Sequence, residues 1–163
     1  MTQGNRSTTR AQGIRYAQAQ FQARGIQAEP LARRDGADFA VHDSGSGRSV
    51  AIKIRTRRRG RDNGWLMTSR DERETRSDLL YIFVDVEPAV PLAYIIPSGE
   101  VANLLRVSHA TWLAKPGRGG RPHRDSDMRR VLSDFGFPVP GYPAGWLEQY
   151  RDRWDLVTRP VDR

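Results

Sequence analysis

The chain of 163 residues contains no cysteine and no long hydrophobic run. The absence of cysteine excludes disulfide bonds and thiolate metal sites. No apolar stretch reaches the roughly 18 residues that a membrane-spanning helix needs. The segment from Met1 to Arg10 is polar and lacks the apolar centre of a signal peptide. We therefore expect a soluble, cytoplasmic protein with no membrane partner.

The composition fits one domain with one core. Hydrophobic residues make up 37% of the chain and charged residues 28%, which is on the polar side for a globular protein. The apolar residues are nevertheless clustered enough to pack. We expect a single domain over residues 1–163, with residues 1–7 frayed.

Acidic residues are too few to balance the basic ones, and the formal net charge is +8. This excess indicates an anionic partner, although the total alone does not choose among DNA, RNA, an acidic protein and a membrane surface. An arginine-rich proteome would produce the same total. Between Arg48 and Arg61, however, there are seven basic residues and no acidic one. This clustering favours nucleic acid, with DNA first and RNA as an alternative, over a merely solvated basic face.

The stretch 36–61 predicts a β-hairpin that carries chemically active side chains. A first strand holds Asp38, the Gly/Ser-rich segment 43–47 forms the turn, and a second strand holds Lys53. Alternation along the second strand places Ile52 and Ile54 on one face and Lys53 on the other. The hairpin therefore brings a carboxylate and an ammonium group onto neighbouring strands.

A carboxylate is a hard oxygen ligand for Mg²⁺, which fills its other positions with water and phosphate oxygens. A neighbouring lysine can orient a water molecule and offset charge that builds up during attack on phosphorus. Asp38 and Lys53 are therefore the candidate catalytic residues, with Asp38 as the metal ligand. The alternatives are an aspartate that caps local backbone amides and a lysine that simply faces outward.

These residues carry a resemblance. The order helix, strand, Gly36-Ala37-Asp38, turn, Ala51-Ile52-Lys53 resembles the PD-(D/E)XK nuclease superfamily. The later segments HATWLAKPG (109–117) and PHRDSDMR (122–129) also look like small bacterial and phage members of it. The resemblance covers most of residues 10–155. It implies a restriction-endonuclease-like sheet and a DNA endonuclease dependent on Mg²⁺ or Mn²⁺, with Asp38 and Lys53 at the motif positions.

The sequence departs from that family at Ala51, where such nucleases carry glutamate or glutamine. Alanine can neither bind a metal nor position a water molecule. If the protein is an enzyme, Asp43, Glu29 or a glutamine of the first helix would replace the missing group, or the substrate would supply it. The alternative is a catalytically inactive nuclease fold that binds nucleic acid or a protein partner. The candidate glutamines are Gln12 and Gln18.

Two basic segments are candidate phosphate contacts, because arginine pairs bidentately with phosphate oxygens. The first is an arginine-rich loop after the Lys53 strand. The second is the Gly/Pro-rich loop 115–124, expected to be mobile and to act as a second arm. Trp65 either stacks on a base or anchors the next strand, and we expect the anchor. The candidate residues are Arg55, Arg57, Arg58, Arg59, Arg61, Lys115, Arg118 and Arg121.

The expected fold is α/β, with a mixed sheet of about five strands flanked by helices. The most apolar run, 79–86, predicts a central strand that forms a hairpin with 92–96. The segment 70–78 reads as a solvated connection. The oligomeric state stays open, with a dimer among the options. The expected helices cover 7–24, a segment from Ser98 as its cap to 108 or 112, 125–134 and 144–155, and the other strands cover 26–32, the Asp38 segment, 49–56 and 64–68.

Overall fold

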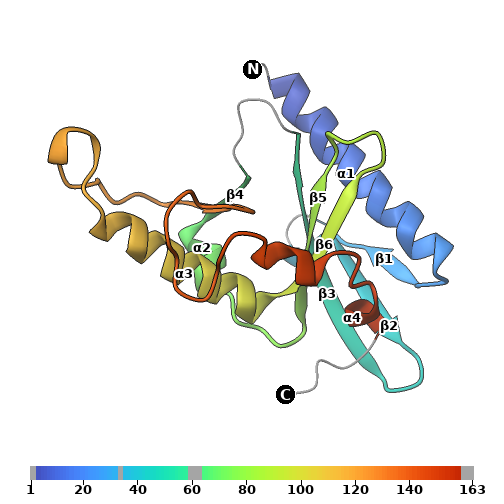
Figure 1. The fold of residues 1–163 in the computed structure, drawn as a ribbon. Helices are drawn as coiled ribbons and strands as arrows, with labels where there is room; N and C mark the ends of the chain where they lie inside the picture. The colour runs from blue at the N-terminus through green and yellow to red at the C-terminus, as the bar shows by residue number, and fades with distance from the viewer. Residues whose placement is uncertain (1–2, 33–34, 59–63, 159–163) are drawn as a thin grey trace.

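The structure, a computed structural model, describes residues 3–32, 35–58 and 64–158, the first five of them by their backbone alone. It is an α/β fold with a mixed five-stranded sheet in the order β1-β2-β3-β5-β6, as expected from the sequence (Figure 1). The sheet strands are β1 (Ala28–Pro30), β2 (Phe39–Asp43), β3 (Arg48–Arg57), β5 (Leu79–Asp85) and β6 (Leu92–Pro97). The other elements are α1 (Gln3–Ala23), β4 (Trp65–Thr68), α2 (Ser69–Glu72), α3 (Ser98–Ala114), β7 (Met128–Val131), α4 (Asp155–Thr158) and two 3₁₀ helices, η2 (Arg118–Gly120) and η3 (Trp146–Tyr150).

Strand β5 is the centre of the sheet, and every one of its residues is buried. It pairs in parallel with β3 and antiparallel with β6. Its side chains alternate between two apolar clusters, one on each face. One cluster includes Ala17 and Phe21 of α1, and the other includes Leu104 and Leu105 of α3. The sheet is thus covered on both faces, as its continuous apolar sequence predicts.

The helix expected over 125–134 is wrong, because this segment contains strand β7. β7 pairs antiparallel with β4 in a second, two-stranded sheet, with Leu66 opposite Arg130. Burial along β7 alternates, since Arg129 and Val131 are buried whereas Met128 and Arg130 are exposed. That period of two matches a strand with one covered face.

The long final helix expected over 144–155 is also wrong. The chain forms η3 and then runs beside the edge of β6, where Tyr94 bridges to Arg151 and the Asp152 amide donates to the Ala93 carbonyl. Asp152 has a φ of 52°, which interrupts a right-handed helix. Trp146 and Trp154 are both buried, one in each of the two apolar clusters.

Several element ends differ from expectation. Helix α1 is already formed at Gln3, within the segment expected to fray. Ser98 lies inside α3 rather than capping it, and its hydroxyl donates to the Arg76 carbonyl. The basic loop 115–124 projects beyond the end of α3 (Figure 1). No helix in the described residues is long and apolar enough to cross a membrane.

Candidate functional site

Asp38 lies where the chain enters β2, and its carboxylate is held by two donors. The Asp38 amide donates to the Ile52 carbonyl at 2.8 Å, which continues the β2–β3 pairing by one residue. Oδ2 accepts the Ile54 amide at 2.7 Å, and Oδ1 accepts Arg10 Nη2 at 2.5 Å. The side chain is 14% exposed. Asp38 therefore ties α1 to the hairpin, and both of its oxygens are engaged.

A Mg²⁺ ion at Asp38 would share the carboxylate with the Arg10 guanidinium and the Ile54 amide. Across the described ranges, no group of three or more histidine, aspartate or glutamate side chains is placed to hold a metal ion. In this conformation the hairpin holds Asp38 with an arginine and not in a set of converging carboxylates.

Lys53 lies in a separate cluster, with two carboxylates that were not among the predicted site residues. Its Nζ lies 3.9 Å from Asp71 Oδ1 and 3.8 Å from Glu74 Oε2, and 5.5 Å from the ring centre of Tyr81. The side chain is only 13% exposed. Burial lowers the pKa of Lys53, and the two carboxylates oppose that effect. Among its described neighbours Lys53 is thus paired with Asp71 and Glu74, not with Asp38.

Asp71 is the centre of this cluster, which we call the Lys53 cluster (Lys53, Arg55, Asp71, Glu74 and Tyr81). One carboxylate oxygen accepts the Thr68 amide at 3.0 Å and its hydroxyl at 3.1 Å. The other accepts the Tyr81 hydroxyl at 2.9 Å and Arg55 Nη2 at 3.4 Å. Burial would raise the pKa of Asp71, but these donors and the nearby cations hold it below its ordinary value. The expectation of a solvated connection over 70–78 is therefore wrong at Asp71.

The side chains expected to replace the missing group at Ala51 lie elsewhere. Asp43 caps the hairpin turn by accepting the Gly45 amide and the Ser46 hydroxyl, and these bonds lower its pKa. Glu29 pairs with His42 at 3.5 Å on the exposed edge of the sheet. Gln12 accepts a hydrogen bond from Arg58 at 2.6 Å, and Gln18 is exposed on α1. The structure places none of the four in the Lys53 cluster.

The described arginines of the run after Lys53 lie close to acidic residues from neighbouring elements. Arg55 contacts Asp71 in the Lys53 cluster. Arg57 belongs to β3 and is buried, so its expected place in a surface loop is wrong. Arg58 is exposed, with a guanidinium nitrogen 3.9 Å from Glu87. Arg59 and Arg61 lie outside the described residues.

Arg57 is one of the few buried charged side chains of the described residues. Its Nε and Nη2 lie 3.1 and 3.0 Å from Asp85 Oδ2, and its guanidinium lies 3.8 Å from the ring centre of Trp65. Arg57 and Asp85 are 7% and 1% exposed. The Trp65 indole donates to the Val84 carbonyl and is itself buried, so its expected role as an anchor is confirmed.

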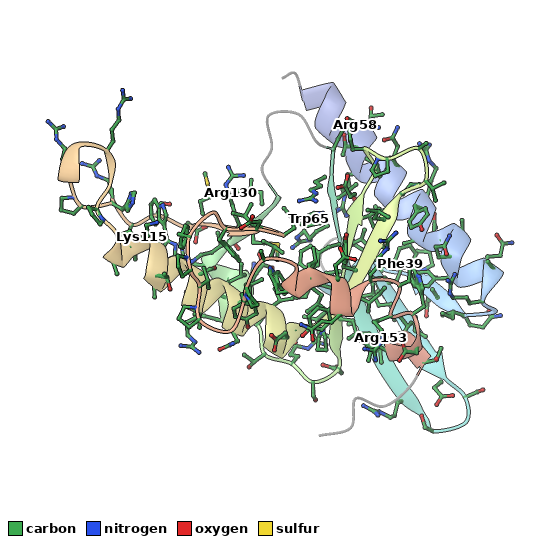
Figure 2. The ribbon with its side chains drawn as sticks, viewed as in Figure 1. Phe39, Arg58, Trp65, Lys115, Arg130 and Arg153 are labelled. Atoms are coloured by element: carbon green, nitrogen blue, oxygen red, sulfur yellow. The ribbon has the colours of Figure 1, made fainter. Side chains whose placement is uncertain are left out.

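The loop 115–124 keeps its positive charge. Arg118, Arg121 and Arg124 are exposed, and none of them forms an ion pair within the described part of the chain. The loop is joined to α3 through His109, which shares a 2.8 Å hydrogen bond with Asp125. Lys115 Nζ lies 4.3 Å from the ring centre of Phe137. Figure 2 shows Lys115 far from Arg58, so the two predicted basic arms lie in different parts of the molecule.

A cavity of about 490 Å³ opens beside this loop, between α3, β7 and the segment that follows β7. Its lining combines aromatic rings with hydroxyl and guanidinium groups. Nothing in the sequence analysis pointed to it, because its walls come from segments up to 29 positions apart, from Ser108 to Phe137. The lining residues are Ser108, His109, Trp112, Ser126, Met128, Arg129, Arg130, Leu132, Phe135 and Phe137.

The geometry thus separates two regions. The Lys53 cluster is an internal arrangement of charges in which most donors and acceptors already have partners. The basic loop exposes three arginines that form no ion pair with any described residue, and the cavity next to it is lined by aromatic rings. Comparison of the chain with protein-family models, with curated proteins and with solved structures found no match.

Proposed function

We propose that this chain binds nucleic acid, with DNA as the first expected partner, through the basic loop 115–124. The observation that carries the proposal is the set of three exposed arginines, Arg118, Arg121 and Arg124, without ion-pair partners in the described residues. Unpaired guanidinium groups on a projecting loop can pair bidentately with phosphate oxygens. Binding would release the counterions condensed on the phosphates, which makes affinity strongly dependent on salt.

The test is the salt dependence of DNA binding. Affinity for a fluorescent duplex would be measured by anisotropy over a range of salt concentrations, for the wild type and for the triple variant Arg118→Ser, Arg121→Ser, Arg124→Ser. Each phosphate contact contributes about 0.9 to the slope of log K against log salt. The triple variant should bind more weakly, with a slope smaller by about 2 to 3.

A matched control removes the same charge from other surfaces. The variant Arg15→Ser, Arg48→Ser, Arg73→Ser also loses three arginines, which come from α1, the start of β3 and the turn after α2. It should keep the slope of the wild type. If both triple variants lose affinity and slope equally, the loop is not the interface and net charge alone drives binding.

A second candidate function is cleavage of the bound strand, as in the nucleases that the hairpin resembles. The observation in its favour is Lys53, which is largely buried beside Asp71 and Glu74 and whose pKa is lowered by burial. Groups whose pKa is perturbed by burial together with a specific charge partner cluster at functional sites. This second candidate includes the proposal that the sheet is arranged as in restriction endonucleases.

Plasmid and single-stranded DNA would be incubated with Mg²⁺, Mn²⁺ or EDTA, with the wild type and with Lys53→Met and Asp38→Asn. Cleavage that needs a metal ion and is lost in both variants, while binding persists, would establish a nuclease. Binding without cleavage under every condition would leave nucleic-acid binding as the function.

A further inference from the structure

The cavity beside the basic loop has the size and lining of a small-ligand site. Such sites measure about 300–1,000 Å³ and combine mostly apolar walls with a few polar groups. This cavity has a volume of about 490 Å³ and is lined by Trp112, Phe135 and Phe137. None of these three rings is fully buried. Phe135 and Phe137 pack against the edge of the core, and all three rings line the cavity.

The rings on one wall are already arranged in parallel. His109 and Trp112, which both line the cavity, have ring centres 5.6 Å apart and an angle of 27° between their planes. His123, from the basic loop, lies against Trp112 at 4.0 Å and 24°. The loop therefore packs directly on the wall of the cavity through a stack of flat rings.

A buried arginine also lines the cavity. Arg129 is 8% exposed; its Nε pairs with Glu72, and its Nη1 donates to the carbonyls of Ser126 and Met128. Its Nη2 donates to no described residue. A fixed guanidinium with a donor to spare suits a ligand with carbonyl or ring-nitrogen acceptors.

We propose that this cavity takes one unpaired nucleobase of a strand whose phosphates lie on the basic loop. The inference rests on the proposed function and names its substrate class, nucleic acid with an unpaired base. Aromatic rings bind bases by stacking whatever the sequence, and exposed arginines supply the contacts to the backbone. A base inside a duplex is stacked and paired, so only an unpaired or extruded base can enter. Lys115 joins the two parts, since it begins the loop and lies over Phe137.

The experiment compares two DNA duplexes that differ in one group. The first has a single bulged base, and the second carries an abasic site at the same bulged position. Anisotropy should show that the wild type binds the first about tenfold more tightly, since stacking of one base on an aromatic side chain is worth about that factor or more. Phe137→Leu should remove this preference and leave the affinity for the abasic duplex unchanged. The control is Val90→Ala, because Val90 is 73% exposed and does not line the cavity. This variant should keep the preference for the duplex with the bulged base.

A second measurement uses the wild-type protein alone, so its outcome does not depend on whether a variant folds. With 2-aminopurine as the bulged base, binding of the wild type should quench its fluorescence as the base stacks. Equal affinity for the two duplexes, or an unchanged 2-aminopurine signal on binding, would overturn this inference while leaving nucleic-acid binding intact. Failure to bind either duplex would overturn the proposed function and this inference together. The arginine triple variant should weaken binding to both duplexes by the same factor.

Discussion

Arg57 and Asp85 form an ion pair inside the protein, and replacing one partner tests whether Arg57 is structural. The residues are 7% and 1% exposed, and the guanidinium also lies on the ring of Trp65. Removing one partner of such a pair leaves the other charge buried and costs about 3–5 kcal/mol. Arg57→Met should therefore lower the free energy of unfolding by about that amount. For a chain of this size the melting temperature should fall by about 2–4 °C for each kcal/mol.

The double variant Arg57→Met, Asp85→Asn separates the energy of the ion pair from the effect of the substitutions on the surrounding packing. The asparagine amide introduced by Asp85→Asn would keep an oxygen to accept the Glu87 amide, which Asp85 Oδ1 now accepts at 3.0 Å. With both charges absent, no charge is left buried without a partner, so the two single effects should not add. We expect a coupling energy of about 2–3 kcal/mol, from urea unfolding followed by circular dichroism. Wild type and both single variants complete the cycle.

The same variants test the interface. If Arg57 is a structural residue, the folded double variant binds DNA with the affinity and salt slope of the wild type. A double variant that is folded and stable yet loses DNA affinity would show that Arg57 contacts phosphate. Single effects that are small and additive would show that the two charges are not buried together. Either result would refute the structural assignment of Arg57.

Two further predictions concern stability. Alanine in place of a helical glycine usually stabilises by about 1 kcal/mol, but a Cβ at Gly13 would lie 1.8 Å from Thr56 Oγ1. Gly13→Ala should therefore destabilise by about 1–3 kcal/mol in urea unfolding, whereas Gly99→Ala on α3, where nothing lies within 4 Å, should not. The pKa of Asp71 is lowered by folding, so its contribution is complete above about pH 4 and is lost as the pH falls through the folded value. Unfolding midpoints of Asp71→Asn below about pH 4 should accordingly vary less with pH than those of the wild type.

The fold was predictable where the sequence signal is local. The apolar run 79–86 and the partner strand 92–96 stand out by composition and by the prolines between them, and both are strands of the sheet. Strand β7 was not predictable in this way. Its partner β4 lies about 60 residues upstream, and the short segment DMRRVL gives no decisive periodicity by itself. Only the pairing across that distance makes it a strand.

The site was predictable in part. Placing Lys53 on the second strand of the hairpin was correct, whereas Asp38 comes one residue before the first strand, β2. The partners of the two side chains are Arg10 from α1 and Asp71 from α2. Asp71 did carry a local signal. Thr68-x-x-Asp71 has the spacing of a capping box, in which the acidic side chain returns to the backbone of the first residue. That pattern indicates an ordered aspartate at the start of a helix, and it therefore argues against a solvated connection at this position.

The distribution of countercharges is the reason that we propose the interface at the end of α3 and not on β3. No acidic residue lies between Arg48 and Arg61 in the sequence, but the parallel register of β3 with β5 sets Arg57 beside Asp85. A run of one charge along a strand can therefore be balanced by the next strand, which the local sequence does not reveal. The loop 115–124 leaves the end of α3 and pairs with none of the described strands, so no register between them brings carboxylates to its arginines. Positive charge persists where the chain leaves the sheet, and there we expect an anionic strand to bind.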